Sequence, residues 1–428
     1  MTLLKKTGVV LLLLLVAGMA IVPCVSAEEH LKKVEFPQEF EDAVVTETST
    51  VLPQLKFDAT QNSVPVNDEL RLEASIQRSQ IISKIAAAEK PSVADIPYGA
   101  IIYHSNEGIT TIFDSSGEQI CKVDDSLIPM VNTPDGIAPA TYVVEVPDKS
   151  FIRDEGEIVN IFYQKERILT IINEYTPNTK YQSTKLLTTD YPAPYIEGAE
   201  ATPISTVGHF LAQWNVPSSP NRVHPYNGDI RQGSKITIWN GLLTADEEKL
   251  LQPVLEWYVK DKSSDPDPTP QWSIATWYVK DGVPGGVHST RRYGIVSTGE
   301  LIQPGHLIQG NMNRAGAIWN GAVSDLTLGV SSTLFLTQTQ STELSYNNLK
   351  PIFVLEGWNP EYWMIPNSLY LPGSVTFGNF IVEDIYGNNV RPASIGTFVN
   401  SQYWDPSTFG LNLINQWPNT ITLQTANS

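Results

Sequence analysis

Cysteine and histidine are scarce in this sequence, and each shortage excludes a class of protein. Of the 428 residues only Cys24 and Cys121 are cysteines, and Cys24 lies in a leader that we expect to be removed. One remaining thiol forms neither an intramolecular disulfide nor a zinc cluster, so the fold must depend on core packing. The six histidines are scattered and no HExxH or GxSxG motif occurs, so we expect no metal and no cofactor, although His209, His224 or His288 could bind one.

Positive charge is also scarce. The chain has 28 Lys and Arg residues against 46 Asp and Glu residues, a formal net charge of -18. Nucleic acid and anionic membrane surfaces both require a basic face, so neither is expected as a partner. Low charge content with abundant Trp, Tyr, Gly and Pro is typical of an exported β protein. Composition alone does not distinguish an enzyme from a lectin.

The first 27 residues have the pattern of a signal peptide. Lys5 and Lys6 precede an apolar run from Val9 to Val22, and the small residues of Val25-Ser26-Ala27 follow. The run is shorter than the ~20 residues of a spanning helix, which favours a cleaved signal over a membrane anchor. We therefore expect a secreted, extracellular protein with no membrane insertion after cleavage.

The rest of the chain divides into four segments. Residues 28–66 are polar and irregular. Residues 67–182 begin with a helix, capped by Asn67 and stopped by Pro91, and continue as a small β-rich domain. Residues 183–204 are rich in Thr, Pro, Ala and Gly and predict a linker. Residues 205–428 show short strands separated by turns, which predicts a mainly β protein ending in an antiparallel β-sandwich.

Two strand-like runs, LLQPVLEW and PIFVLEGW, each place polar side chains in apolar surroundings. Because side chains alternate along a strand, Gln252 and Glu256 share a face with Leu250, Val254 and Tyr258, opposite Leu251, Leu255 and Trp257. Glu356 likewise shares a face with Ile352, Val354 and Trp358, opposite Phe353 and Leu355. Pro253 predicts a sheet edge or a bulge. An amide and a carboxylate on one sheet face could hold a water molecule between them, which suggests hydrolysis.

Aromatic strands offer a surface beside this pair. The candidate substrate-binding residues are Trp239, Glu256, Trp277 and Tyr278.

Short segments across about 200 residues resemble, in order, the eqolisin family of glutamic peptidases. They are QWNVPSS at Gln213 to Ser219, TIWNGLL at Thr237 to Leu243, LLQ at Leu250 to Gln252, ATWYV at Ala275 to Val279, GHLI at Gly305 to Ile308, IFVLE at Ile352 to Glu356 and SVTFGNFIV at Ser374 to Val382. The resemblance implies a concanavalin-like β-sandwich and a secreted glutamic endopeptidase acting on polypeptides at acidic to neutral pH. It implies Gln252 and Glu356 as the catalytic pair, with Trp239 and Glu256 in the cleft.

The resemblance also implies that the N-terminal domain is a propeptide removed within the linker, although a permanent partner domain is equally compatible. The chain departs from the family pattern in three ways. The family's acidic residue after the tryptophan is missing at Asn240-Gly241-Leu242, Thr276 stands where the family has Glu, and the family disulfides are absent. A weaker resemblance to neprosin-type glutamic peptidases, which pair two Glu residues, keeps Glu256 open as the partner of Glu356.

Two other functions remain open. A non-catalytic secreted module binding carbohydrate or another surface could use Trp239, Trp257 and Trp277 as stacking platforms. Glu256 and Glu356 could also form the carboxylate pair of a glycoside hydrolase, for which their separation would decide. Substrate specificity and oligomeric state are not specified by the sequence.

Overall fold

The computed structural model describes most of the chain after residue 95. The described residues are 96–125, 130–133, 136–173, 195–204, 207–220, 235–245, 249–259, 270–280, 283–316, 318–338, 348–358, 371–400 and 412–425. The predicted signal peptide, the irregular segment 28–66, the helix that begins at Asn67, and residues 183–194 of the predicted linker lie outside these ranges. Within the described part, no helix is long and apolar enough to cross a membrane.

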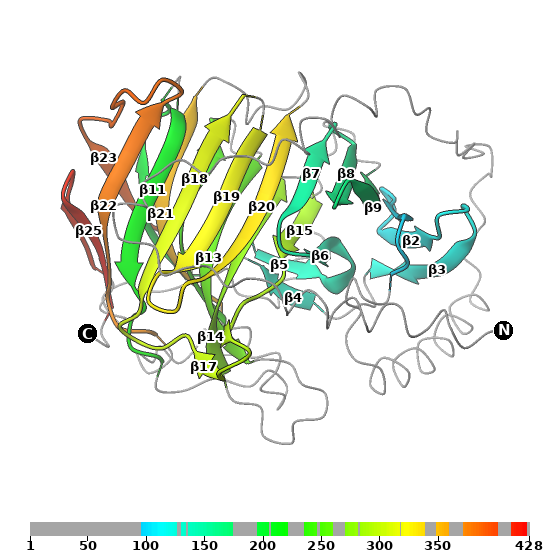
Figure 1. Cartoon of the computed structure of the whole chain (residues 1–428), viewed down its shortest axis with the longest axis horizontal. Coiled ribbons are helices and arrows are strands. Elements are labelled where there is room, and N and C mark those ends of the chain that lie inside the picture. The colour runs from blue at the N-terminus through cyan, green and yellow to red at the C-terminus, as the bar shows by residue number, and fades with distance from the viewer. Residues whose placement is uncertain are drawn as a thin grey trace.

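The described residues form two large sheets, of which the larger has thirteen strands (Figure 1). Its order is β24 (Asn412–Gln416), β25 (Thr420–Gln424), β22 (Val375–Asp384), β11 (Val207–Asn215), β18 (Leu307–Ala315), β19 (Ile318–Asp325), β20 (Val330–Gln338), β7 (Ser150–Asp154), β8 (Ile158–Tyr163), β9 (Glu166–Asn173), β1 (Ala100–His104), β2 (Ile109–Phe113) and β3 (Gln119–Asp124).

The second large sheet has eight strands among the described residues. Its order is β23 (Ile395–Asn400), β10 (Tyr195–Ala201), β21 (Leu349–Trp358), β12 (Lys235–Thr244), β13 (Lys249–Val259), β14 (Pro270–Lys280), β15 (Val283–Ser289) and β6 (Val143–Val146). Two small sheets pair β4 (Met130–Thr133) with β5 (Gly136–Pro139) and β16 (Gly294–Ile295) with β17 (Glu300–Leu301). A short 3₁₀ helix, η6, spans Ala140–Tyr142.

The predicted mainly β sandwich is confirmed, but its large sheets are mixed rather than purely antiparallel. The described parallel pairs are β1 with β9, β6 with β15, and β7 with β20, and each includes a strand that precedes residue 174. Strands β6 and β7 add to the edges that β15 and β20 would otherwise expose, and so cover edges open to unwanted pairing.

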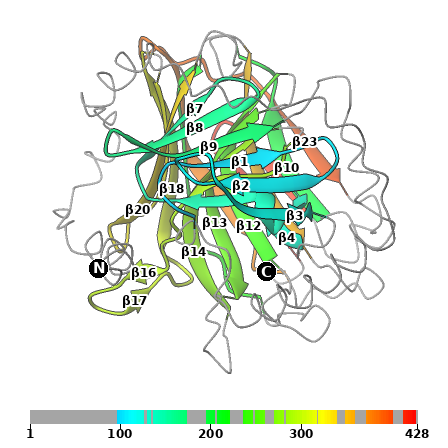
Figure 2. The ribbon, with the colours of Figure 1, turned by 90° about the vertical axis from the view of Figure 1, so that its right-hand side faces the viewer.

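Apart from the β4–β5 pair, the described N-terminal strands continue the two large sheets of the sandwich. Figure 1 shows β7, β8 and β9 following β20, and Figure 2 shows the same strands from the side. The buried Asp154 carboxylate fixes this junction, because it accepts hydrogen bonds from Tyr278 Oη at 2.5 Å and Lys280 Nζ at 3.1 Å. Burial, and then the nearby Asp154 charge, raise the pKa of Tyr278 well above its usual value.

Strand β10 lies inside the range 183–204 that the sequence predicts as a linker. It runs between β23 and β21, where Gly198 permits close packing. A Cβ atom on Gly198 would lie 2.5 Å from the Phe398 ring and 2.6 Å from the Phe353 carbonyl oxygen. The small residues that resemble linker composition are therefore, in this strand, a packing requirement.

The two sheets enclose the main core, and the predicted alternation of β13 and β21 is confirmed. Leu251, Leu255, Phe353 and Leu355 belong to the core between the sheets. The opposite face of the eight-stranded sheet, called the outer face below, carries a separate apolar cluster. That cluster comprises Trp239, Leu250, Val254, Ala275, Trp277, Val279, Ile352 and Val354.

The prediction of a sheet edge at Pro253 is wrong, because β13 lies between β12 and β14. The proline is accommodated by a local gap in pairing. Trp239 pairs with Val254 and Leu242 with Leu251, while the two positions between them form no regular pair. Proline has no amide hydrogen, so one ladder bond is absent there.

Asn240 and Gly310 join the two large sheets by a tight contact, and we expect Gly310→Ala to be destabilising. Asn240 Nδ2 donates to the Gly310 carbonyl at 3.2 Å, and a Cβ on Gly310 would lie only 1.8 Å from Asn240 Oδ1. Overpacking of this kind costs about 1–3 kcal/mol in free energy of unfolding. Urea denaturation would measure it, with Gly378→Ala as the control, since the nearest atoms there are 3.7 and 3.9 Å away. Equal effects of the two substitutions would contradict the contact.

A buried histidine makes the N-terminal strands sensitive to acid. His104 Nδ1 contacts Thr110 Oγ1 at 2.8 Å, and that hydroxyl donates to Asp125 Oδ1 at 2.6 Å, so Nδ1 carries the hydrogen. Burial lowers the pKa of His104 from 6.5 to about 3. The folded state therefore favours the neutral ring, and stability present above pH 6.5 is lost as the pH falls towards 3.

Between pH 7 and 4.5 this histidine should remove about 2–3 kcal/mol of the free energy of unfolding. Asp125 acts in the opposite sense, because burial raises the pKa of its carboxyl group. The His104→Asn variant isolates the histidine: its urea stability should depend less on pH than that of the wild type, although loss of the ring that stacks on Tyr142 lowers stability at pH 7. Parallel pH profiles for the two proteins would refute the assignment.

Candidate functional site

The carboxylate of Glu356 lies on the outer face of the eight-stranded sheet and is held by β12. Glu356 is 3% exposed. Its Oε2 accepts hydrogen bonds from Thr237 Oγ1 at 2.7 Å and from Trp239 Nε1 at 3.1 Å. Thr237 lies directly opposite Glu356 in the β12–β21 register, so the backbone pairing itself places the donor. The carboxylate is thus fixed on the face that the sequence predicts.

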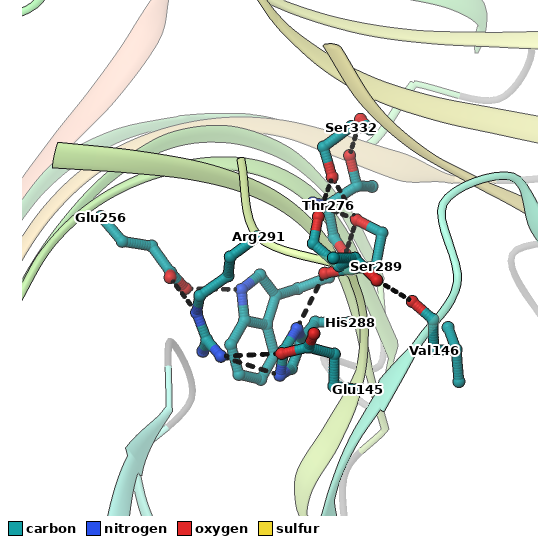
Figure 3. A network of polar contacts seen from close by, with 10 residues as sticks. Glu145, Val146, Glu256, Thr276, His288, Ser289, Arg291 and Ser332 are labelled. Atoms are coloured by element: carbon teal, nitrogen blue, oxygen red, sulfur yellow. Dashed lines mark hydrogen bonds and ion pairs between the residues drawn. The ribbon is translucent and has the colours of Figure 1, made fainter. Parts of the chain in front are cut away.

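Glu256 brings a second carboxylate to the same face. It is fully buried, and both of its oxygens are engaged. Oε1 accepts from Trp277 Nε1 at 2.7 Å, and Oε2 accepts from Arg291 Nε at 2.6 Å. Figure 3 shows Arg291 reaching back to Glu256 from one side and to Glu145 and His288 from the other. A buried carboxylate is tolerated when a cation and hydrogen bonds compensate the lost hydration.

Gln252 contributes an amide to the same face. The side chain is fully buried, and among the described residues neither Oε1 nor Nε2 has a hydrogen-bond partner. In the register it stands opposite Trp277, which in turn stands opposite His288. A buried polar group without a partner costs free energy, so the Gln252 amide calls for an explanation, and a role in catalysis is one.

The strand register shows how far apart these groups stand. Thr237 pairs with Glu256 on one side and with Glu356 on the other, so the two glutamates are level, that is, at the same position along the strand direction. Their Cα atoms are about 10 Å apart across two strand spacings. Gln252 lies four residues further along β13, which places its Cα about 16 Å from that of Glu356. The predicted pair therefore shares one face, but Glu256 is nearer than Gln252 to Glu356.

The predicted aromatic surface is only partly present. Tyr278 points between the sheets, where its hydroxyl bonds Asp154, because neighbouring residues of a strand face opposite sides. Trp257 also faces the main core and packs on Trp272 at 5.2 Å. Trp239 and Trp277 do lie on the outer face, but they are 3% and 0% exposed. None of these rings offers an exposed stacking platform.

Two residues at the departures from the family pattern, Asn240 and Thr276, lie on the core side. Asn240 donates to the Gly310 carbonyl of the other sheet. Thr276 donates its hydroxyl to the Ser332 carbonyl at 2.7 Å, and its backbone amide donates to Ser289 Oγ (Figure 3). A glutamate at position 276 would be buried between the sheets, so this difference does not alter the outer face.

The sequence pattern did not indicate Thr237, Arg291 or Glu145, and it suggested His288 only as a possible metal ligand. Only Thr237 has a local signal, because it lies two residues before Trp239 and so shares its face. Arg291 follows β15, and Glu145 arrives on β6, which pairs with β15 in parallel across a large sequence separation. No local pattern predicts that pairing.

Of the histidines considered as metal ligands, the two that the structure describes, His209 and His288, lie on different sheets. His209 on β11 contacts Asn311 at 2.9 Å and Glu383 at 3.3 Å, while His288 contacts the Ser289 carbonyl and Arg291 on the other sheet. His224 lies outside the described residues. In the part of the chain that the structure describes, no group of three or more potential ligands could hold a metal ion.

Comparison with known proteins gives a likeness of fold. No family model matches the chain, and no curated protein does. Among solved structures, scytalido-glutamic peptidase with a peptide-based transition state analogue matches with a TM-score of 0.35 and 14% identity, covering 54% of this chain and 98% of that one. SCP-B, an eqolisin peptidase in complex with the tripeptide Ala-Ile-His, matches with a TM-score of 0.35 and 16% identity over the same shares.

A further match is the CBM2 module of the evolved Dit protein of Lactobacillus casei BL23 phage J-1. Its TM-score is 0.24 with 14% identity, covering 38% of this chain and 62% of that one. The two large sheets of this chain, with the main core between them, make it a β-sandwich protein. The similarity to eqolisin peptidases is one of fold across about half of the chain.

Proposed function

We propose that the outer face of the eight-stranded sheet is the catalytic site of a secreted, glutamic peptidase-like hydrolase that cleaves polypeptides. The observation that supports this most is the fixed Glu356 carboxylate, held by Thr237 and Trp239 on the same face as the unpaired Gln252 amide. One group can move protons, and the other has an unused donor for a developing negative charge.

In this mechanism Glu356, as a carboxylate, removes a proton from a water molecule, which attacks the scissile carbonyl carbon. The Gln252 amide hydrogen would stabilise the oxyanion of the tetrahedral intermediate, which requires the two side chains to lean toward each other, since their Cα atoms are about 16 Å apart. Protonated Glu356 then gives its proton to the leaving nitrogen, and the C–N bond breaks. Thr237 and Trp239 keep the base in one orientation, which favours reaction by positioning.

Glu256 is the alternative partner of Glu356, and the register supports it because the two glutamates are level. A pair of Glu residues would resemble the neprosin-type arrangement. The bonds from Arg291 and Trp277 nevertheless occupy both oxygens of Glu256, which suits a fixed charge better than a proton carrier. The carbohydrate-binding alternative loses support because its three tryptophan platforms are buried.

The test is to express the chain from Glu28 and incubate it with a denatured protein between about pH 3 and 7, where a carboxyl group changes charge. Mass spectrometry would identify new peptide termini. Gln252→Ala and Glu256→Gln, both checked for folding, decide which residue assists Glu356, since the true partner should lose about 10²–10³ in rate. Absence of cleavage by the wild type, also after proteolysis within residues 174–194, would refute the proposal.

A further inference from the structure

Arg291 is held rigidly on its inner side. Its Nε bonds Glu256 at 2.6 Å, its Nη1 contacts His288 Nε2 at 3.2 Å, and its guanidinium carbon lies 5.4 Å from the centre of the Trp277 ring. The Arg291 side chain is 17% exposed, whereas that of Glu256 is fully buried. Each terminal guanidinium nitrogen carries two N–H groups, so a planar guanidinium fixed in this way can also present its outer edge, including Nη1, to a second carboxylate.

That outer edge meets a carboxylate from the N-terminal part of the chain. Glu145 Oε2 lies 3.6 Å from Arg291 Nη1, and the Glu145 side chain is 39% exposed (Figure 3). The distance exceeds that of a hydrogen bond, in contrast to the inner contact with Glu256. An ion pair of this length with a partly hydrated carboxylate contributes little to stability, so a ligand can replace Glu145.

We propose that Arg291 is a recognition residue for a carboxylate of the substrate, and that Glu145 occupies this place in the free protein. The inner ion pair with Glu256 fixes the guanidinium of Arg291. The ligand carboxylate displaces Glu145 from the outer contact. A substrate carboxylate would form a shorter, charge-assisted hydrogen bond in place of a long contact to a partly hydrated side chain.

The placement defines where in the substrate the carboxylate should lie. Arg291 contacts Glu256, which stands about 10 Å from Glu356 between Cα atoms. An extended peptide advances about 3.3 Å per residue, and the outer edge of Arg291 lies beyond Glu256 as seen from Glu356, so the recognised group would lie more than about three residues from the bond attacked at Glu356. This step rests on the proposed function. The carboxylate can belong to an Asp or Glu side chain or to the peptide C-terminus.

The overall charge of the protein makes such a preference diagnostic. At a formal net charge of -18, the protein as a whole repels acidic peptides. Tighter binding of an acidic peptide than of its neutral analogue therefore requires a local cation.

The experiment uses the chain from Glu28 with Glu356→Gln, so that bound peptides stay intact. Fluorescence anisotropy would compare labelled eight-residue peptides that differ only in Glu against Gln at one position, and in a free against an amidated C-terminus. The position of Glu and the free terminus then distinguish the two sources of carboxylate. We expect the best acidic peptide to bind about tenfold tighter than its neutral analogue.

Two further variants test the roles of the arginine and of Glu145. Arg291→Gln should abolish the preference, and E145Q should strengthen binding of acidic peptides several-fold with no change for neutral ones. Glu155→Gln, a partly exposed carboxylate elsewhere on the N-terminal strands, is the matched control and should change nothing. E145Q also keeps the test decisive if Arg291→Gln fails to fold.

Equal binding of acidic and neutral peptides, or no effect of E145Q, would overturn the inference. The proposed function is judged separately by the protein with Glu356 intact. Cleavage without a carboxylate preference would support the hydrolase and refute the role of Arg291. A carboxylate preference without cleavage would support the role of Arg291 in binding and refute the hydrolase.

Discussion

Replacing Glu356 by Gln is expected to lower kcat/KM for a polypeptide substrate by about 10³-fold or more while the protein remains folded. The amide retains the shape of the carboxylate, and its oxygen can still accept from Thr237 and Trp239. It cannot accept a proton from water at any pH between 3 and 7. The rate of cleavage of a quenched fluorescent peptide, measured beside the urea stability of the variant, tests this directly.

The matched control is Glu383→Gln. Glu383 is also on a strand, but on the other sheet, where its carboxylate lies 3.3 Å from His209 and is 31% exposed. The Glu383→Gln variant should have the same kcat/KM as the wild type. If Glu356→Gln were to cleave as fast as the wild type, the catalytic base would be another residue, and Glu256, level with Glu356, would be examined next.

The face assignment at this site was predictable because apolar residues fix it. Leu251, Leu255 and Trp257 in β13 and Phe353 and Leu355 in β21 are large side chains at alternate positions that enter the core, so the positions between them, including Gln252 and Glu356, are placed on the opposite face. The same rule shows why Trp277 and Tyr278 could not both line one surface. The error at Tyr278 came from treating two adjacent aromatics as one patch.

What the sequence could not predict depends on contacts between distant segments. Arg291 acquires its role from Glu256, Trp277 and Glu145, which lie on three different strands. The level position of Glu256 with Glu356 follows from two strand registers through Thr237, and no local pattern specifies a register. Pro253 led to the incorrect prediction of a sheet edge. Its missing amide hydrogen is accommodated inside the sheet, where two positions of β12 and β13 form no regular pair.

The N-terminal strands bear on whether residues 67–182 are a propeptide, because β6 and β7 complete the two sheets. Asp154 on β7 accepts from Tyr278 and Lys280, both on β14 of the other sheet, and from the Gly156 amide at 2.8 Å. Asp148, between β6 and β7, accepts from the Thr333 amide at 2.7 Å and pairs with Arg292 at 3.3 Å. Cleavage in the linker would leave these contacts in place.

Replacing Asp154 by Ala should therefore lower the free energy of unfolding by about 3 kcal/mol or more. The substitution leaves the buried Tyr278 hydroxyl without its acceptor and Lys280 without its counter-ion, and burial prevents water from replacing them fully. Urea denaturation at pH 7, followed by tryptophan fluorescence, measures the loss. Limited proteolysis should in addition cut the N-terminal strands sooner, since their anchor to β14 is gone.

Glu155→Gln supplies the comparison, because Glu155 is the next residue and pairs with Arg153 at 2.7 Å in a partly exposed position. Its loss should change the free energy of unfolding by no more than about 0.5 kcal/mol, as for other exposed pairs. Both substitutions remove one negative charge, but only the one at Asp154 leaves buried partners without their acceptor. The difference between the two variants therefore distinguishes the effect of buried contacts on stability from the effect of net charge. A similar small effect of both would mean that the N-terminal strands dock weakly, and a detachable propeptide would then be the better description of residues 67–182.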